Sequence, residues 1–325
     1  MSETVSIRMG TRASLLARTQ TGWVADRLRA WGHAVTIETM HTSGDERRDV
    51  PVPRIGGDGV FVRELEAALL EGRIDAAVHS LKDLPTAETA GLALACVPVR
   101  ALPFDVFVSR RHPSLAALPA GAIVGTSSIR RALQVQALRP DVEISGIRGN
   151  VDSRLRKLDA GEYDALVLAG AGLERLGLEA RITEVLRPEA FWPAVAQGAL
   201  VVQTRAADVA VRAAIAPLDD PQTHAAVRAE RSFLASLAGG CLAPIGAWAR
   251  WSDSGALVLD GCVLEAVGGG VRRIVAGATA PPGDTPEMLG RAVADELRNA
   301  GVDEMLAAAR ENAMHRGTPP PADRS

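Results

Sequence analysis

The order of apolar and polar positions along the chain predicts strands and helices that follow each other in turn. Short apolar runs of the kind found in buried strands recur, and after each polar turn apolar residues are spaced three and four apart, as on one face of a helix. Alternation of this kind is typical of a parallel, doubly wound sheet. The predicted strands cover 5–9, 34–40, 74–78, 93–97, 105–108, 122–125, 142–147, 164–169 and 200–204, and the predicted helices cover 15–31, 61–72, 129–138, 151–160 and 171–176.

The last third of the chain has a different pattern. A predicted helix over 223–237 ends at a Gly-Gly pair, and apolar runs over 256–266 and 271–278 flank three glycines, which predicts an antiparallel hairpin. A helix over 286–299 covers it. Earlier, proline-bearing stretches at 99–103 and 192–198 read as two crossings between α/β units. The predicted fold class is therefore α/β, with two doubly wound lobes and a small α+β C-terminal domain that has an antiparallel sheet.

Composition excludes several classes of function. The net charge of −3 provides no general attraction to nucleic acid or anionic membrane, and 3% aromatic residues are too few for base-stacking platforms. No apolar run approaches the roughly 18 residues of a membrane span, and no signal-peptide core is present. The six histidines do not cluster, and no P-loop, GxGxxG, HExxH or GxSxG motif occurs. We expect a cytoplasmic protein without a metal site.

A polar loop follows the predicted strand 74–78. His79, Ser80, Lys82 and Asp83 lie within five residues, where ligands of open α/β sheets bind. If this segment is extended, Lys82 points away from Asp83. The alternative is a solvated loop with surface charges.

Arginines recur at the start of predicted helices. A helix N-terminus already carries partial positive charge, so arginine is unfavourable there unless an anion is bound. Free N–H groups and guanidinium groups together bind carboxylate or phosphate, which predicts a polyanionic small ligand; the alternative is a set of surface ion pairs. The positions are Arg12 with Ser14, Arg130 and Arg131 after 126–128, and Arg148 with Arg154 around Asn150.

The three cysteines are odd in number and far apart, which favours neither a disulfide framework nor a zinc site. Cys96 and Cys262 lie in apolar runs and are expected in the core. Cys241 follows two glycines and is a weak candidate nucleophile, because no histidine lies near it in the sequence to activate it.

Ordered motifs from about residue 7 to 246 resemble the porphobilinogen deaminase, or hydroxymethylbilane synthase, family. The resemblance weakens beyond residue 246, and two positions depart from the family pattern: Ala196 stands where glycine is frequent, and Asp58 stands in a predicted lid where lysine is common. The matching blocks are GTRASLLA at 10–17, HTSGD at 41–45, GVFVRELE at 59–66, HSLKDLPT at 79–86, GTSSIRR at 125–131, IRGNV at 147–151, AQGA at 196–199 and GGC at 239–241.

The resemblance implies three domains, the first two similar to the lobes of periplasmic binding proteins. Domain 1 would comprise 1–99 and 199–217, domain 2 would comprise 104–194, and domain 3 would comprise 220–313, followed by a disordered tail over 314–325. It also implies a monomeric enzyme that joins four porphobilinogen molecules head to tail, with release of ammonia, into the linear tetrapyrrole hydroxymethylbilane. The growing chain would start from a covalent dipyrromethane cofactor.

The resemblance also implies roles for individual residues. Asp83 would be catalytic, pairing with pyrrole N–H groups and stabilising positive charge. The cofactor would be a thioether on Cys241, held by Lys82, Asp83, Thr126, Ser128, Arg130, Arg131 and Arg148. The substrate would be bound by Arg12, Ser14, Gln20, Phe61, Ser80, Arg148, Arg154 and Gln197.

Two other functions remain open from the residues alone. A non-catalytic two-lobed binding protein for a carboxylated metabolite would account for the crossings and the arginines, but it would not need Cys241. A thiol hydrolase using Cys241 would need a nearby histidine and an oxyanion site, which the sequence does not indicate.

Overall fold

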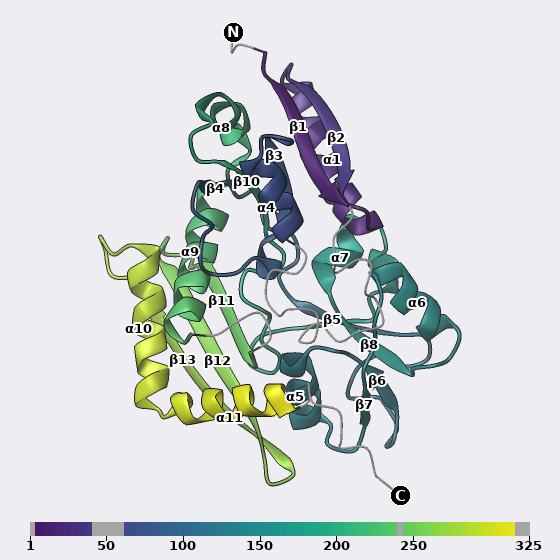
Figure 1. The fold of residues 1–325 in the computed structure, drawn as a ribbon. Coiled ribbons are helices and arrows are strands. Elements are labelled where there is room, and N and C mark those ends of the chain that lie inside the picture. The colour runs from purple at the N-terminus through teal and green to yellow at the C-terminus, as the bar shows by residue number, and fades with distance from the viewer. Residues whose placement is uncertain (1–3, 41–61, 239–242, 316–325) are drawn as a thin grey trace, which may run out of the picture.

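The computed structural model describes residues 4–40, 62–238 and 243–315, and these residues build three separate sheets (Figure 1). The segment 41–59, which contains the predicted lid position Asp58, lies outside the described residues, as do Phe61 and Cys241. Of the tail predicted over 314–325, residues 316–325 also lie outside them, whereas 314 and 315 end helix α11 (Val302–His315), so the predicted tail begins too early. No helix in the described ranges combines the length and the apolar character needed to cross a membrane.

The first sheet has the strand order β2-β1-β3-β10-β4. Four of its strands come from the first 96 residues, and β10 joins them from residues 200–205. Strands β1 and β2 pair in parallel, as do β1 and β3, whereas β10 is antiparallel to β3 and β4. The strands are β1 (Ser6–Arg12), β2 (Ala34–Met40), β3 (Ala76–Ser80), β4 (Leu92–Cys96) and β10 (Leu200–Arg205), and the helices are α1 (Leu15–Ala30), α4 (Arg63–Leu70) and α8 (Val209–Ile215).

The second sheet has the strand order β7-β6-β8-β5-β9 and repeats this arrangement. Strand β6 pairs in parallel with β7 and β8, whereas β5 is antiparallel to β8 and β9. The strands are β5 (Asp105–Ser109), β6 (Ile123–Gly125), β7 (Glu143–Ser145), β8 (Ala165–Ala169) and β9 (Glu184–Leu186), and the helices are α5 (Ile129–Leu138), α6 (Val151–Asp159) and α7 (Gly170–Arg175), followed by the short 3-10 helix η2 (Glu179–Arg181).

Each lobe also contains one strand of opposite direction, which follows a crossing and which the alternation of strands and helices did not indicate. Strand β10 starts with Leu200 beside Ser80, the last residue of β3, and β5 starts with Asp105 beside Ala169, the last residue of β8. Both crossings thus deliver the chain at the carboxyl ends of the parallel strands. The polar turns of the two lobes lie at these same ends.

The third sheet is antiparallel, with the order β11-β12-β13, and it confirms the predicted hairpin. Helices α9 and α10 pack closely against each other: a Cβ at Gly290 would lie 2.4 Å from the carbonyl oxygen of Ala229, so only glycine fits there. Strand β11 and helix α11 were not predicted. The elements are η3 (Ala216–Leu218), α9 (Pro221–Ser236), β11 (Ile245–Trp251), β12 (Leu257–Val267), β13 (Gly270–Thr279), α10 (Pro286–Asn299) and α11 (Val302–His315).

The two crossings lie side by side. Gly198 accepts a backbone hydrogen bond from Ala101 N at 3.1 Å, and a Cβ on Gly198 would lie 2.6 Å from the Ala101 carbonyl oxygen. Ala196, the position that departs from the family pattern, has a φ of 56°, in the left-handed region that favours glycine. The backbone at positions 196 and 198 therefore favours small residues.

A buried ion pair ties both crossings to the third sheet. Arg100, on the first crossing, donates from Nη1 and Nη2 to the fully buried carboxylate of Glu230 on α9, at 2.6 and 3.1 Å. The same carboxylate accepts from the backbone N–H groups of Ala249 at 2.8 Å and Ala196 at 2.5 Å. Arg100 Nε donates to the carbonyl of Gln197 at 2.8 Å, so one cluster holds α9, β11 and both crossings together.

Candidate functional site

A hollow of about 220 Å³ lies where the carboxyl ends of the parallel strands of the two lobes face each other, and we call it the central hollow. Its lining brings together turns that lie far apart in the sequence. The described residues that line it are Arg12, Ser14, Leu16, Gln20, Ser80, Lys82, Asp83, Arg131, Gly149, Asn150, Val151, Arg154, Leu168, Ala169, Ala171, Gly172, Arg175, Gly198 and Ala199.

The wall from the first lobe is built by the start of α1. Ser14 caps this helix, because its Oγ accepts a hydrogen bond from Ala17 N at 3.2 Å. One and a half turns later, Gln20 donates from Nε2 to Ser80 Oγ at 3.1 Å. The cap thus sets the direction of α1, and the amide of Gln20 fixes the end of β3 beside it.

Lys82 and Asp83 lie on a 3-10 turn, η1 (Leu81–Asp83), so the expectation of an extended segment is wrong. Leu81 is buried and donates its N–H to Ala199 O at 3.0 Å, which anchors the turn to the second crossing. In a 3-10 turn successive side chains are about 120° apart rather than on opposite sides. Lys82 and Asp83 therefore both line the central hollow.

The ammonium group of Lys82 lies in cationic surroundings. Its Nζ donates to Gln197 Oε1 at 3.4 Å. Burial and the nearby charge of Arg131 lower the pKa of Lys82 to about 8, although Asp83 and Asp105 act in the opposite direction. Lys82 is thus mostly charged at neutral pH, but it loses its proton far more readily than an ordinary lysine.

This pKa can be measured directly. Lys82 and Lys157 are the two lysines of the chain. We expect trace labelling with an amine-acylating reagent, read by peptide mass spectrometry, to show half-maximal reactivity of Lys82 near pH 8, with Lys157 as the internal reference for the reagent. Arg131→Gln should move the midpoint of Lys82 upward, because it removes a neighbouring cation. A midpoint above pH 10 in the unaltered protein would contradict the assigned environment.

Two predicted ligand-binding arginines have a buried carboxylate as their partner. Asp105, fully buried at the start of β5, accepts from Arg130 Nη1 at 2.7 Å and from Arg131 Nε at 2.9 Å. Burial raises the pKa of Asp105, but the charges of Arg130 and Arg131 outweigh it and hold the pKa well below its usual range. Asp105 is therefore an anion that orients both guanidinium groups.

The two arginines differ in what they can reach. Arg130 Nη1 also donates to the carbonyl of Trp192, and Arg130 is absent from the lining of the central hollow. Arg131 lines it. Gln197, fully buried, joins this cluster through its amide, donating to Asp105 Oδ1 at 3.0 Å and accepting from Arg131 Nη2 at 3.4 Å. Gln197 therefore connects the lobes rather than lining the hollow.

The second-lobe wall carries cations whose described hydrogen bonds go to backbone carbonyls. Arg154 Nε donates to Gly149 O at 2.8 Å, and Arg175 Nη2 donates to Gly198 O at 2.6 Å. Burial, and then the charges of Arg131 and Arg148, lower the pKa of Arg154 to about 10; burial lowers that of Arg175 to about 10. Both are still cations at neutral pH, and an anion bound beside Arg154 would relieve its repulsion from Arg131 and Arg148.

The structure brings eight predicted site residues together in the lining: Arg12, Ser14, Gln20, Ser80, Lys82, Asp83, Arg131 and Arg154. The described lining does not include Thr126, Ser128, Arg130, Arg148 or Gln197. Arg175 was missed, because it follows a buried strand like the others but lies at the last residue of its helix rather than at the first turn.

His79 does not line the central hollow, although the sequence groups it with Ser80, Lys82 and Asp83. It is buried in β3, and burial lowers its pKa to about 4. The imidazole is therefore neutral at physiological pH and does not line the central hollow. Cys96 and Cys262 are buried, as expected, and burial raises the pKa of each thiol to about 12.

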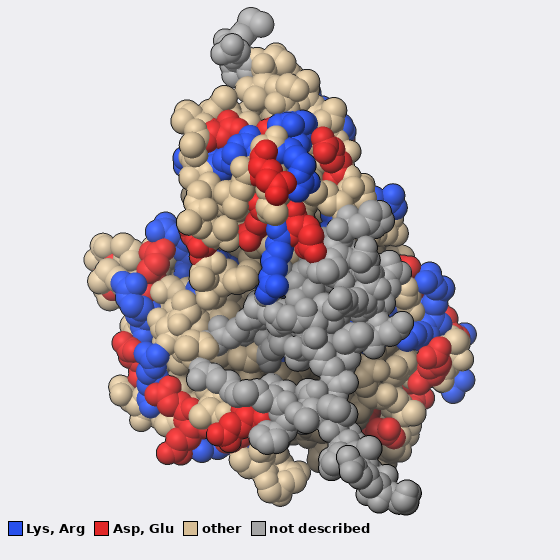
Figure 2. Space-filling view, viewed as in Figure 1, with Lys and Arg blue, Asp and Glu red and all other residues tan. Residues whose placement is uncertain are grey.

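Outside the hollow, charges of both signs are mixed. On the face shown in Figure 2, lysine and arginine side chains of the described residues alternate with aspartate and glutamate. Within the described ranges, no group of three or more His, Cys, Asp and Glu side chains is arranged to hold a metal ion. The concentration of cations around the central hollow is thus a local feature of a chain whose net charge is −3.

Two models of one protein family together match most of the chain. A family model described as "Porphobilinogen deaminase, dipyromethane cofactor binding domain" matches residues 7–213, and one described as "Porphobilinogen deaminase, C-terminal domain" matches residues 224–299. The porphobilinogen deaminase of Roseiflexus castenholzii is 49% identical over 304 residues, which are 93% of this chain and 99% of that protein. That of Acidothermus cellulolyticus is 48% identical over 310 residues, covering 94% and 92%.

Solved structures with a related arrangement are much more distant. The methionine binding protein MetQ has a TM-score of 0.42 and 15% identity, covering 67% of this chain and 92% of MetQ. A nutrient binding protein from Burkholderia cenocepacia bound to methionine has a TM-score of 0.41 and 15% identity, covering 67% and 93%. At these values the likeness says nothing about what this chain binds.

Proposed function

This chain belongs to the porphobilinogen deaminase family, and we propose that the central hollow is its catalytic site. The enzyme joins four porphobilinogen molecules into the linear tetrapyrrole hydroxymethylbilane with release of ammonia, using a dipyrromethane cofactor. It is a transferase of tetrapyrrole synthesis.

One observation carries the assignment of the site. Among the described lining residues, five side chains are cationic and a single one, Asp83, is a carboxylate. Each pyrrole of substrate and product carries an acetate and a propionate, so a chain growing in one place needs many cations. Arginine pairs with carboxylates through two parallel hydrogen bonds, which fixes orientation as well as charge. The cationic residues are Arg12, Lys82, Arg131, Arg154 and Arg175.

The same cations, together with Asp83, fit the dipyrromethane cofactor. A dipyrromethane presents four carboxylates and two pyrrole N–H groups, and it supplies the nucleophilic pyrrole from which the chain grows. Arg131 and Arg154, which already repel each other, would hold its carboxylates, and Lys82 would hold another. Asp105 keeps Arg131 oriented before any ligand arrives. Cys241 is proposed as the point of covalent attachment.

Asp83 is proposed as the catalytic residue. It is exposed within the hollow, on a turn anchored by buried Leu81, so it can meet a ligand without moving the backbone. Its carboxylate would accept the pyrrole N–H and stabilise the positive charge that develops on the substrate ring as ammonia leaves. A fixed charge of this kind needs no reorganisation during the reaction, which makes it effective.

Three further properties are proposed with the function. The domain division 1–99 with 199–217, 104–194 and 220–313 is supported by the way the strands segregate into three sheets. The ligand-binding roles of Thr126, Ser128, Arg130, Arg148 and Gln197, which lie outside the lining, remain predictions, as does the role of Phe61, which is not among the described residues. A cytoplasmic monomer is the proposed working form, supported by the family and by the absence of a membrane-spanning helix in the described ranges.

Intact mass under denaturing conditions tests the proposal. We expect the purified protein to exceed the mass of the bare chain by two linked pyrroles, and peptide mapping to place the excess on the peptide that contains Cys241. Cys241→Ser should have the bare mass, whereas Cys262→Ser, which alters a buried thiol of the third sheet, should keep the excess.

A bare chain that gains no mass on incubation with porphobilinogen would favour the non-catalytic binding protein. An excess that survives in Cys241→Ser would reject the attachment site but not the enzyme.

A further inference from the structure

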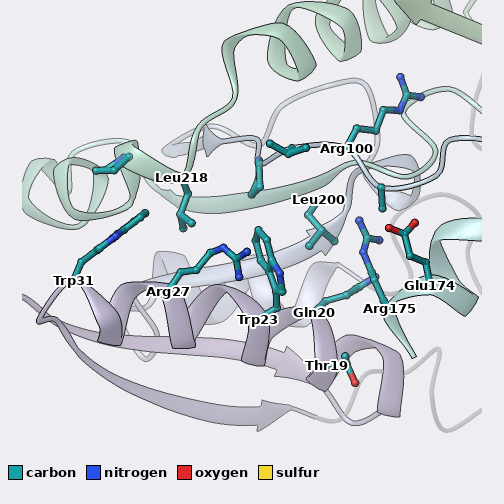
Figure 3. Close-up of a pocket in the computed structure, with 14 residues that line it drawn as sticks. Thr19, Gln20, Trp23, Arg27, Trp31, Arg100, Glu174, Arg175, Leu200 and Leu218 are labelled. Carbon is teal, nitrogen blue, oxygen red and sulfur yellow. The ribbon is translucent and has the colours of Figure 1, made fainter. Parts of the chain in front are cut away.

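A second and larger hollow, of about 680 Å³, adjoins the central one, and we call it the hinge groove (Figure 3). Its volume lies within the range of small-molecule sites, about 300–1,000 Å³. The residues that line it are Thr19, Gln20, Trp23, Arg27, Trp31, Pro98, Val99, Arg100, Ala101, Glu174, Arg175, Leu200, Pro217 and Leu218.

The walls of the hinge groove come from both lobes and from the crossing between them. Helix α1 of the first lobe provides one wall, the end of α7 in the second lobe provides another, and residues 98–101 of the first crossing close it. In Figure 3, Trp31 extends from α1 toward Leu218, the guanidinium of Arg27 lies against Trp23, and Arg175 lies at the other end of the groove. A molecule in this groove would therefore touch both lobes and the first crossing that joins them.

The groove is apolar, with aromatic surfaces and cations. Trp31 and Val99 are 43% and 70% exposed, so their apolar surfaces are open to a ligand in the groove. The guanidinium of Arg27 lies 3.6 Å from the ring centroid of Trp23, so a flat cation covers a flat ring.

The charged groups favour an anionic ligand. Arg100 is already engaged by Glu230, but Arg27 and Arg175 have no carboxylate partner within 4 Å among the described residues. The acid of the lining, Glu174, accepts from Leu102 N at 2.9 Å through one of its oxygens. Cations and indole rings together suit a flat ring that carries a carboxylate, because the ring stacks while the carboxylate meets a guanidinium.

We propose that the hinge groove binds a flat aromatic or pyrrolic carboxylate, and that the bound molecule lowers turnover by restraining the two lobes relative to each other. Gln20 and Arg175 line both hollows, so occupancy of the groove acts on two residues of the catalytic lining. Gln20 also holds Ser80, three positions before Asp83. The inference rests on the proposed function of the central hollow only for this effect on turnover; the binding itself is independent of it.

Two probes distinguish the possible sources of such a ligand. Biliverdin, a stable linear tetrapyrrole with propionates, represents the class of the enzyme's own product. Indole-3-acetate represents other aromatic carboxylates. Each is titrated into the cofactor-loaded enzyme, and binding is followed by tryptophan fluorescence and by calorimetry, neither of which needs turnover.

Matched variants locate the binding. Trp31→Ala and Arg27→Ala alter the groove without touching the central lining, and each should weaken binding about tenfold, the loss expected for one stacking or cation contact. Trp251→Ala removes an equally exposed tryptophan from β11, and Arg18→Ala removes an exposed arginine from α1; both should bind like the unaltered protein. Circular dichroism checks that each variant is folded.

The effect on catalysis provides the second readout. Bound probe should lower kcat at saturating porphobilinogen, with a kinetic pattern that added substrate does not overcome. Tighter binding of biliverdin would identify a product-responsive site, and tighter binding of indole-3-acetate would identify a site for another metabolite. The proposal is overturned if neither probe binds at millimolar concentration, or if Trp31→Ala and Arg27→Ala bind as well as their controls. An inactive protein that still binds at the groove would refute the proposed function instead.

Discussion

Asp83→Ala is expected to lower kcat by about 10²- to 10³-fold, the cost of removing one preorganised group that stabilises charge in a transition state. The substitution removes the single carboxylate among the described residues that line the central hollow and leaves five cations there. Because Asp83 is exposed at the end of a turn anchored by Leu81, the fold should persist. The measurement is the rate of ammonia release from porphobilinogen in a stopped assay, with circular dichroism as the check on folding.

Three comparisons make this result specific. Asp83→Glu keeps the charge and should recover part of the rate, whereas Asp83→Asn keeps the size without the charge and should not. Glu88→Ala removes an exposed carboxylate a few residues further along the same loop, outside the lining, and should have little effect. Near-normal release of ammonia by Asp83→Ala would reject the charge-stabilising role.

Glu230→Gln is expected to lower the free energy of unfolding by about 3–5 kcal/mol, the cost of leaving one partner of a buried ion pair uncompensated. The carboxylate of Glu230 is fully buried and is the partner of Arg100. It also accepts two backbone N–H groups, and an amide in its place would turn a donor toward one of these or toward the guanidinium. Since this cluster joins α9 to both crossings, the loss should loosen the third sheet from the lobes.

Denaturant unfolding followed by circular dichroism measures the change. Glu287→Gln is the matched control, because Glu287 pairs with Arg228 between α9 and α10 at the surface, where such pairs contribute at most about 1 kcal/mol. A change in Glu230→Gln no larger than that of Glu287→Gln would mean that the buried pair does not hold the domains together.

Local patterns in the sequence predicted most of the elements. Helices α5 (Ile129–Leu138) and α10 (Pro286–Asn299) have the predicted bounds, because apolar periodicity and end signals lie within the helix itself. Strand β11 was missed since its sequence, IGAWARW, is poor in β-branched residues and becomes a strand by pairing with β12.

The sequence predicted many of the residues of the site, but not which of them pair with each other or which of them line the hollow. Arginine beside a helix start indicates an anion site, yet the sequence gives no sign that Asp105, twenty-five residues away, pairs with Arg130 behind the hollow. Arg175 lies at the end of its helix, where arginine is unremarkable, and only the approach of the second crossing brings it to the hollow.

The sequence by itself determined most of the segments that form strands and helices, the family, and the polar turns that follow the parallel strands. Each of these depends on residues within a few positions of one another, or on motifs that persist whatever the surroundings. Only the tertiary structure decided the directions of β5 and β10, the 3-10 turn that lets Lys82 and Asp83 share one hollow, and the separation of Arg131 from Arg130. These features depend on where the two crossings deliver the chain, and that position is set by packing among parts more than a hundred residues apart, such as Gln197 with Lys82 and Arg100 with Glu230.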